Sequence, residues 1–272
     1  MCRHLAYLGP ELLLGALLVE PAHSLYRQAW APRRQRNGTV NADGFGVGWY
    51  PADDPVPARY RRAGPLWADP SFADLARVIR AGAVLAAVRD ATLAGADGEA
   101  AAAPFVSGRW LFSHNGAVPG WPDAAAPLVP TLPPVDLLSM EARTDSAFVW
   151  ALVLHRLRGG AEPGTALGET VRQVAEAAPA SRLNLLLTDG TTIAATAWGD
   201  SLWYRAGPGD SVTVASEPYD DDPHWREVPD RTVLTASRAT GVRLAPAGNP
   251  ASSPTPDSAR AGGPPSPKEP CT

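Results

Sequence analysis

Short apolar runs recur along the chain and predict strands that build a buried sheet core. The first, residues 5–8, begins almost at the chain start and predicts a strand that ties the N-terminus to a sheet. Small and bulky apolar residues alternate over 44–50, and 84–88 and 110–112 are short runs of strand type. We expect these last three runs to be neighbouring core strands.

A β-hairpin is predicted in the second half of the chain. The apolar runs 183–188 and 191–198 flank Asp189-Gly190, a favoured two-residue turn. Residues 201–205 and 211–215 continue the strand-rich pattern.

Helical spacing of apolar residues appears in two segments, 71–80 and, more strongly, 144–157, and predicts two amphipathic helices. The apolar stretch 12–19 is too short to span a bilayer and is followed by no signal-peptidase site. We interpret it as a buried helix or strand.

The apolar pattern ends near residue 249, which predicts the domain boundary. Residues 2–248 are expected to form one domain, because 272 residues with 45% hydrophobic content suit one sizeable core. Residues 249–272 consist mainly of Pro, Ser, Gly and Ala and cannot offset their ordering entropy. They are predicted to be a disordered tail.

The charge balance and the cysteine usage restrict the class of partner. A net charge of -4 argues against binding to nucleic acid or to a membrane, since such binding needs a basic face. A small-molecule partner is therefore expected. Cys2 and Cys271 form no C-x-x-C pair or disulfide framework, which favours the reducing cytoplasm.

Cys2 is a candidate nucleophile because of its position. Processing generally removes an initiator Met before a small residue, which leaves Cys2 with a free α-amino group. An α-amine with a pKa of about 7.7–8.0 can accept the thiol proton without a separate histidine. The alternative is an incidental cysteine, so this assignment needs other motifs.

The sequence Ser113-His114-Asn115-Gly116 supplies such a motif directly after the predicted strand 110–112. An Asn-Gly pair there predicts a sharp turn at a sheet end. That turn would direct the Asn115 amide and the Gly116 N–H at one point, as an oxyanion hole for amide cleavage requires. An ordinary hairpin turn is the alternative.

Six motifs follow one another along the chain: MCRHLAYLG, NADGFGVGWY, AAVRDAT, FSHNGAV, RTDSAF and LNLLLTDG. In this order they make the chain resemble the class II glutamine amidotransferases over nearly its whole length. Within that family, the opening motif, VR-x-AT and ASEP (215–218) are most similar to the γ-glutamyl-hercynylcysteine sulfoxide hydrolases of ergothioneine biosynthesis.

This resemblance implies an α+β fold, a four-layer αββα sandwich of two mainly antiparallel sheets as in N-terminal-nucleophile hydrolases. Cys2 would be the nucleophile, with Asn115 and Gly116 as the oxyanion hole. Substrate would be bound by Arg89 at the glutamyl α-carboxylate and by Asp145 at the α-ammonium, with His114 beside them. Considered without this resemblance, Arg89 is interpreted as one partner of a surface ion pair, and Asp145 as the N-terminal cap of a helix.

One departure from the family pattern concerns the leaving group. Glutaminase domains commonly carry R-W-A-T-H where this chain has residues 89–93, RDATL. Loss of the Trp and the His predicts a leaving amine larger than ammonia. The chain also shows no synthase segment, so hydrolysis without a cofactor is expected. The alternatives are a glutaminase, a hydrolase of another γ-glutamyl amide, or a γ-glutamyl-binding module without catalytic activity. A homodimer is left open.

The remaining signals favour ordinary structure. GFGVG lacks the spacing of a dinucleotide loop, and the five histidines lack zinc-motif spacings, so no metal is predicted. The basic cluster Arg33, Arg34 and Arg36 is interpreted as a solvated loop, with a contact to an anionic substrate as the alternative. Residues 220–222 are interpreted as a charged surface turn.

Overall fold

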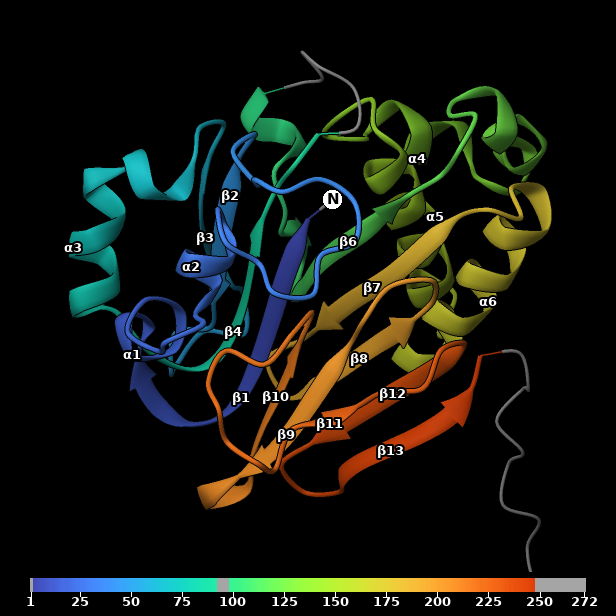
Figure 1. The fold of residues 1–272 in the computed structure, drawn as a ribbon. Coiled ribbons are helices and arrows are strands. Elements are labelled where there is room, and N and C mark those ends of the chain that lie inside the picture. The colour runs from blue at the N-terminus through green and yellow to red at the C-terminus, as the bar shows by residue number, and fades with distance from the viewer. Residues whose placement is uncertain (1, 92–97, 248–272) are drawn as a thin grey trace, which may run out of the picture.

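The computed structural model describes residues 2–91 and 98–247, which form two stacked antiparallel sheets enclosed by helices on both sides (Figure 1). The seven-stranded sheet has the order β11 (Arg226–Glu227), β9 (Trp203–Gly207), β10 (Ser211–Ala215), β1 (Arg3–Leu13), β4 (Arg80–Val88), β2 (Phe45–Trp49) and β3 (Ala58–Arg62). The six-stranded sheet has the order β13 (Gly241–Pro246), β12 (Thr232–Ser237), β8 (Thr192–Ala197), β7 (Arg182–Thr188), β6 (Trp110–Ala117) and β5 (Phe105–Ser107).

Helices cover the outer face of each sheet (Figure 1). The seven-stranded sheet packs against α1 (Leu14–Leu18), α2 (Leu25–Gln28) and α3 (Pro70–Val78). The six-stranded sheet packs against α5 (Asp145–Arg158) and α6 (Pro163–Ala177), with α4 (Pro134–Leu138) beside α5. Short 3-10 segments occupy Leu66–Ala68, Gly98–Ala101, Asp123–Thr131 and Pro208–Asp210.

A third apolar cluster lies between the sheets and completes the four layers. It joins Leu8 and Leu85 of one sheet with Leu111 and Leu186 of the other, all of them buried. The predicted αββα sandwich is therefore confirmed. No helix within the described ranges combines the length and apolarity needed to cross a bilayer.

Most of the predicted strands are present, but one lies in a different sheet from that expected. Residues 84–88 and 44–50 fall in β4 and β2, which pair with each other beside β1. Residues 110–112 begin β6 of the other sheet, so their prediction as a neighbour of those strands is wrong. Phe112 stacks on Trp150 of α5 at 5.0 Å, which commits β6 to the opposite helical layer.

Local signals explain the two predicted helices. Asp69 caps α3 by accepting a hydrogen bond from the Phe72 N–H at 3.1 Å, and Thr144 caps α5 through the Ala147 N–H at 3.2 Å. The predicted hairpin is also present as β7–β8, with Gly190 at a φ of 86° in its turn.

Other segments were not predicted or differ in extent. The stretch 12–19 divides between the end of β1 and α1. No pattern in the sequence predicted α6, β3, β12 or β13. The tail predicted at 249–272 lies outside the described residues.

Candidate active site

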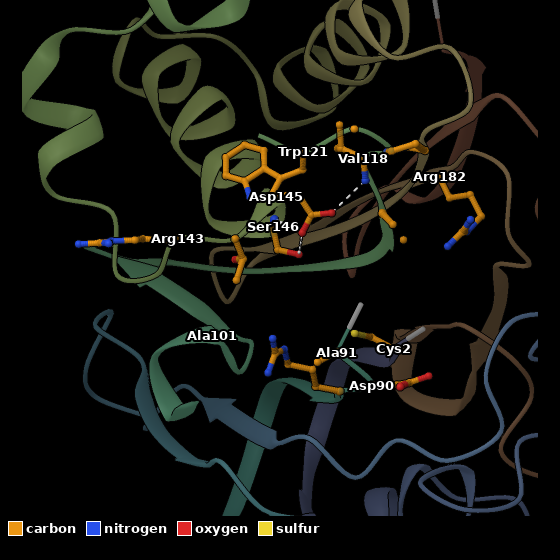
Figure 2. Close-up of a pocket in the computed structure, with 16 residues that line it drawn as sticks. Cys2, Asp90, Ala91, Ala101, Val118, Trp121, Arg143, Asp145, Ser146 and Arg182 are labelled. Atoms are coloured by element: carbon orange, nitrogen blue, oxygen red, sulfur yellow. Dashed lines mark hydrogen bonds between the residues drawn. The ribbon is translucent and has the colours of Figure 1, made fainter. Parts of the chain in front are cut away.

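A pocket with a volume of about 350 Å³ lies where the two sheets meet the start of α5 (Figure 2). Its wall takes residues from the start of β1, the loop after β4, the end of β6, the first turn of α5 and the start of β7. The residues that line it include Cys2, Arg89, Asp90, Gly116, Trp121, Arg143, Asp145, Ser146 and Arg182. Four of the six predicted site residues line this pocket, and the other two, His114 and Asn115, do not.

Cys2 directly precedes β1, the central strand between β4 and β10, and is partly buried in the pocket wall. Burial raises the pKa of its thiol, while a backbone hydrogen bond at Asp90 and the charge of Arg89 act in the opposite direction. The Asp145 carboxylate adds to the rise. The thiol therefore lies within electrostatic reach of both predicted glutamyl-binding residues.

Arg89 is held beside Cys2 by the loop at residues 41–46. Its backbone N–H donates to the Gly44 carbonyl at 2.7 Å, and its Nη1 donates to the Asp43 carbonyl at 3.2 Å. The Asp43 carboxylate accepts from the Ala91 N–H at 2.7 Å. This loop therefore fixes the segment that carries Arg89. Of the two departures from R-W-A-T-H, Asp90 replaces the Trp and lines the pocket, whereas Leu93 replaces the His and lies outside the described residues.

Asp145 opens α5 and lines the pocket. Its Oδ2 accepts from the Val118 N–H at 2.9 Å, and its Oδ1 accepts from the Ser146 N–H at 2.7 Å (Figure 2). The N-cap itself is Thr144, so the reading of Asp145 as the capping residue is replaced by a role in the first turn, where the helix dipole favours an anion. These contacts fix the carboxylate at the wall of the pocket.

The Asn115-Gly116 pair lies in a strand and not in a turn, so the predicted turn is wrong. Strand β6 continues to Ala117 and pairs with β7 through Asn115↔Asn184 and Gly116↔Leu183. The tertiary ladder thus overrides the local turn preference of Asn-Gly. A Cβ at position 116 would collide with the Arg182 carbonyl oxygen, so the close approach of β7 requires glycine.

Gly116 lines the pocket, whereas Asn115 lies fully buried outside its lining residues. The Asn115 Nδ2 is 3.5 Å from the Ser216 Oγ, and its Oδ1 has no hydrogen-bond partner among the described residues. An unpaired oxygen on a buried amide is uncommon in folded proteins, and functional sites are one place where it occurs.

His114 is buried behind the pocket wall, with both ring nitrogens occupied. Nδ1 is 3.0 Å from the Ser146 Oγ, and Nε2 is 2.9 Å from the Arg182 carbonyl oxygen. His114 therefore bridges α5 and β7, and its contact with the substrate stays a prediction.

Arg182 is a pocket residue that the sequence did not single out, although it immediately precedes the LNLLLTDG motif. Its Nε lies 3.3 Å from Oδ2 of the buried Asp200, an ion pair without hydrogen-bond alignment. Burial raises the pKa of Asp200, and the charges of Arg182 and Arg3 oppose that rise.

The loop with the three arginines is bound to the ASEP segment. The Glu217 carboxylate, fully buried, accepts from the backbone N–H groups of Arg33 at 2.9 Å and Arg34 at 2.8 Å. Residues 220–222 are more than a charged surface turn, since Asp220 and Asp222 both pair with Arg205 at 2.9 Å. Within the described residues, no group of three or more His, Cys, Asp or Glu is placed to hold a metal ion.

A cysteine beginning the central strand of an αββα sandwich, next to a pocket, is the arrangement of the N-terminal-nucleophile hydrolases. Residues 12–208 match the family described as glutamine amidotransferases class-II, and the chain belongs to that family.

Individual relatives agree with this assignment. The chain is 44% identical to the γ-glutamyl-hercynylcysteine sulfoxide hydrolase of Mycolicibacterium smegmatis, over 86% of this chain and 95% of that protein. It is 42% identical to the protein of the same name from Mycobacterium tuberculosis, over 90% of this chain and 96% of that protein. Among solved structures, a glutamine aminotransferase class-II domain protein from Silicibacter pomeroyi superposes with a TM-score of 0.66 at 25% identity, covering 90% of this chain and 99% of that one.

Proposed function

We propose that this protein hydrolyses the γ-glutamyl amide of γ-glutamyl-hercynylcysteine sulfoxide and releases glutamate and hercynylcysteine sulfoxide, a step of ergothioneine biosynthesis. The observation that carries the proposal is the presence of Cys2, Arg89, Gly116 and Asp145 in the wall of one pocket. Two relatives above 40% identity that carry this activity in their names support the choice of substrate.

The proposed reaction begins when Met1 is removed and the Cys2 α-amine takes the proton of its own thiol. The thiolate attacks the γ-carbonyl, and the Gly116 N–H and the Asn115 amide stabilise the tetrahedral oxyanion. The Cys2 ammonium then protonates the leaving nitrogen, the C–N bond breaks, and a glutamyl thioester remains. Water, deprotonated by the same amine, hydrolyses the thioester to glutamate and restores the thiol.

Substrate recognition in this proposal depends on the two charges that flank the thiol. Arg89 offers a planar fork that matches the glutamyl α-carboxylate, and Asp145 offers an anion to the α-ammonium. No external cofactor enters these steps. The proposal also places the protein in the cytoplasm, with no nucleic-acid or membrane partner; a homodimer stays a prediction for light scattering to check.

The experiment that tests the function is glutamate release by the purified protein. Wild type is expected to turn over the hercynyl conjugate faster than glutathione or glutamine, and Cys2→Ala is expected to bind the conjugate yet release no glutamate. Undiminished release by Cys2→Ala contradicts the mechanism. Faster turnover of glutamine than of the conjugate makes the protein a glutaminase instead.

The state of the N-terminus provides an independent check. Intact-mass measurement is expected to show a chain that lacks Met1, because the mechanism needs the Cys2 amine. A fully active protein that retains Met1 excludes this amine as the base.

A further inference from the structure

We infer that Arg182 forms a subsite for the carboxylate of an α-amino acid leaving group, so that the enzyme distinguishes γ-glutamyl amino acids from simple γ-glutamyl amides. This inference rests on the proposed function for the orientation of the substrate, with the glutamyl head between Arg89 and Asp145. Arg182 is a further cation of the pocket wall that the glutamyl head does not use.

The backbone of Arg182 lies directly against the proposed oxyanion hole. Arg182 pairs with Ala117, and its carbonyl oxygen is so close to Gly116 that no Cβ fits between them. The same oxygen lies 2.9 Å from the His114 Nε2. The side chain of Arg182 is therefore tethered beside the site where the scissile carbonyl would be held.

The chemistry of a γ-glutamyl amino acid matches this position. Its leaving nitrogen carries an α-carbon, and the carboxylate is attached to that α-carbon, only two bonds from the scissile nitrogen. A cation that binds this carboxylate must lie next to the oxyanion hole. Ammonia released from glutamine carries no such group and needs no such cation.

The guanidinium of Arg182 is oriented in advance. Its Nε lies 3.3 Å from Asp200, whose backbone carbonyl accepts from the Asn184 Nδ2 at 3.0 Å. Its stem packs on Gly199, where an added Cβ would come within 3.1 Å of the Arg182 Cγ. The ion pair and the packing restrain the Arg182 side chain and reduce the entropy lost when a ligand binds the terminal Nη atoms.

The other edge of the guanidinium is available. The Arg182 side chain is 29% exposed, while that of Asp200 is 2% exposed. Within residues 2–91 and 98–247 no group accepts a hydrogen bond from the terminal Nη atoms of Arg182, which are the atoms that bind a carboxylate in a bidentate manner.

Arg143 is the other remaining arginine of the pocket and serves as the comparison. Figure 2 shows Arg143 and Arg182 on opposite sides of the pocket, with Asp145 between them. The backbone of Arg182, and not that of Arg143, pairs with the strand of the oxyanion hole. The structure thus favours Arg182 for a carboxylate next to the scissile bond.

The test compares two substrates that differ only in this carboxylate, γ-glutamyl-alanine and γ-glutamyl-ethylamide. The quantity measured is the ratio of their kcat/KM values from glutamate release. Arg182→Gln is expected to lower this ratio by about 10- to 100-fold, as for loss of a hydrogen bond between charged groups. Arg182→Lys should retain part of the ratio, and Arg143→Gln should retain the wild-type ratio.

An unchanged ratio in Arg182→Gln overturns the inference, and so does a fall that occurs only in Arg143→Gln. If Arg182→Gln does not fold, Arg182→Lys carries the test through an intermediate ratio, and a wild-type ratio in it overturns the inference.

Binding measured by calorimetry separates this inference from the proposed function. In Cys2→Ala, adding Arg182→Gln should bring the Kd values of the same two compounds close to each other. If this happens but the wild type releases no glutamate, the protein lacks the proposed activity and still has the subsite. If the wild type releases glutamate normally but Cys2→Ala has the same Kd ratio with and without Arg182→Gln, the protein has the proposed activity and lacks the subsite.

Discussion

The side chains of Asn115 and Ser216, 101 residues apart, meet beside the start of the central strand, with the Asn115 Nδ2 3.5 Å from the Ser216 Oγ. The same hydroxyl accepts from the backbone N–H of His4 at 3.0 Å. Ser216 therefore links the strand that follows Cys2 to the strand that carries the proposed oxyanion donor.

We predict that Ser216→Ala lowers kcat about tenfold while KM changes less than about twofold. Removal of an oxyanion donor itself, as in Asn115→Ala, typically lowers the rate ~10²–10³-fold. Loss of the Ser216 hydroxyl, which positions that donor, should lower the rate less. Steady-state kinetics with the hercynyl conjugate measure both constants. Ser201→Ala is the matched control, because its hydroxyl donates to the Ser216 carbonyl at 2.8 Å without contacting Asn115. Equal losses in the two variants would contradict a specific role of Ser216.

Gly116 gives a second prediction, through packing. A Cβ at this position would collide with the Arg182 carbonyl oxygen and come within 2.7 Å of the His114 Nε2. Strand β6 must then separate from β7, so Gly116→Ala should lower the free energy of unfolding by ~3 kcal/mol, as for overpacking of a dense interior. Urea unfolding measures this value.

The control for that change is Gly64→Ala. An added Cβ there meets no atom within 4 Å, and the backbone is not left-handed. The free energy of unfolding should change by less than about 1 kcal/mol. Similar losses in both variants would show that the close approach at Gly116 is not the cause.

The family resemblance, and not spacing or local order alone, predicted the residues that share the pocket wall. Cys2 at the second position, Arg89 after a strand and Asp145 at a helix start all lie in the pocket wall. Asn115-Gly116 was wrongly predicted as a turn, since pairing with β7 outweighs the local preference.

Arg182 and Ser216 could not be identified from spacing. Each acquires its role only when strands distant in sequence come together, Arg182 against Gly116 and Ser216 against Asn115. The ASEP motif contained a usable signal, because an acidic residue in an otherwise apolar strand end needs buried partners. Those partners, the N–H groups of Arg33 and Arg34, lie more than 180 residues away.

Glu217 gives a third prediction, about the order of the arginine loop. Glu217→Ala removes the acceptor of two backbone N–H groups, and bonds to a charged group contribute ~1.5–3 kcal/mol each. The loop should open more often, so trypsin should cleave after Arg33, Arg34 or Arg36 at least about tenfold faster, in proportion to the open population. Mass spectrometry of timed digests measures these cuts.

Asp221→Ala is the matched control for Glu217. Asp221 pairs with the Arg33 side chain at 3.4 Å, but its own side chain is 76% exposed, and such ion pairs contribute little. Cleavage should change less than about twofold. If Asp221→Ala accelerates cleavage as strongly as Glu217→Ala, the buried carboxylate is not what orders the loop.

The fourth prediction concerns His4 and acid stability. His4 is fully buried, and burial lowers its pKa to about 3, with the charge of Arg3 acting in the same direction. Its Nδ1 is 3.1 Å from the Ser113 Oγ, and its Nε2 has no partner among the described residues. The folded protein therefore holds this ring in the neutral form.

An unfolded chain protonates the same histidine at a pKa of about 6.5. Stability from the neutral ring is complete above pH 6.5 and is lost as the pH falls from 6.5 toward 3, because only the unfolded state takes up the proton. Over the interval from pH 7 to pH 5 this loss is about 2 kcal/mol.

His4→Gln should reduce the difference in unfolding free energy between pH 7 and pH 5 by that amount, measured with urea at both pH values. Ser113→Ala keeps the histidine and should keep the wild-type difference even if its absolute stability is lower. A His4→Gln protein whose stability declines as steeply as that of wild type would assign the acid sensitivity to other groups.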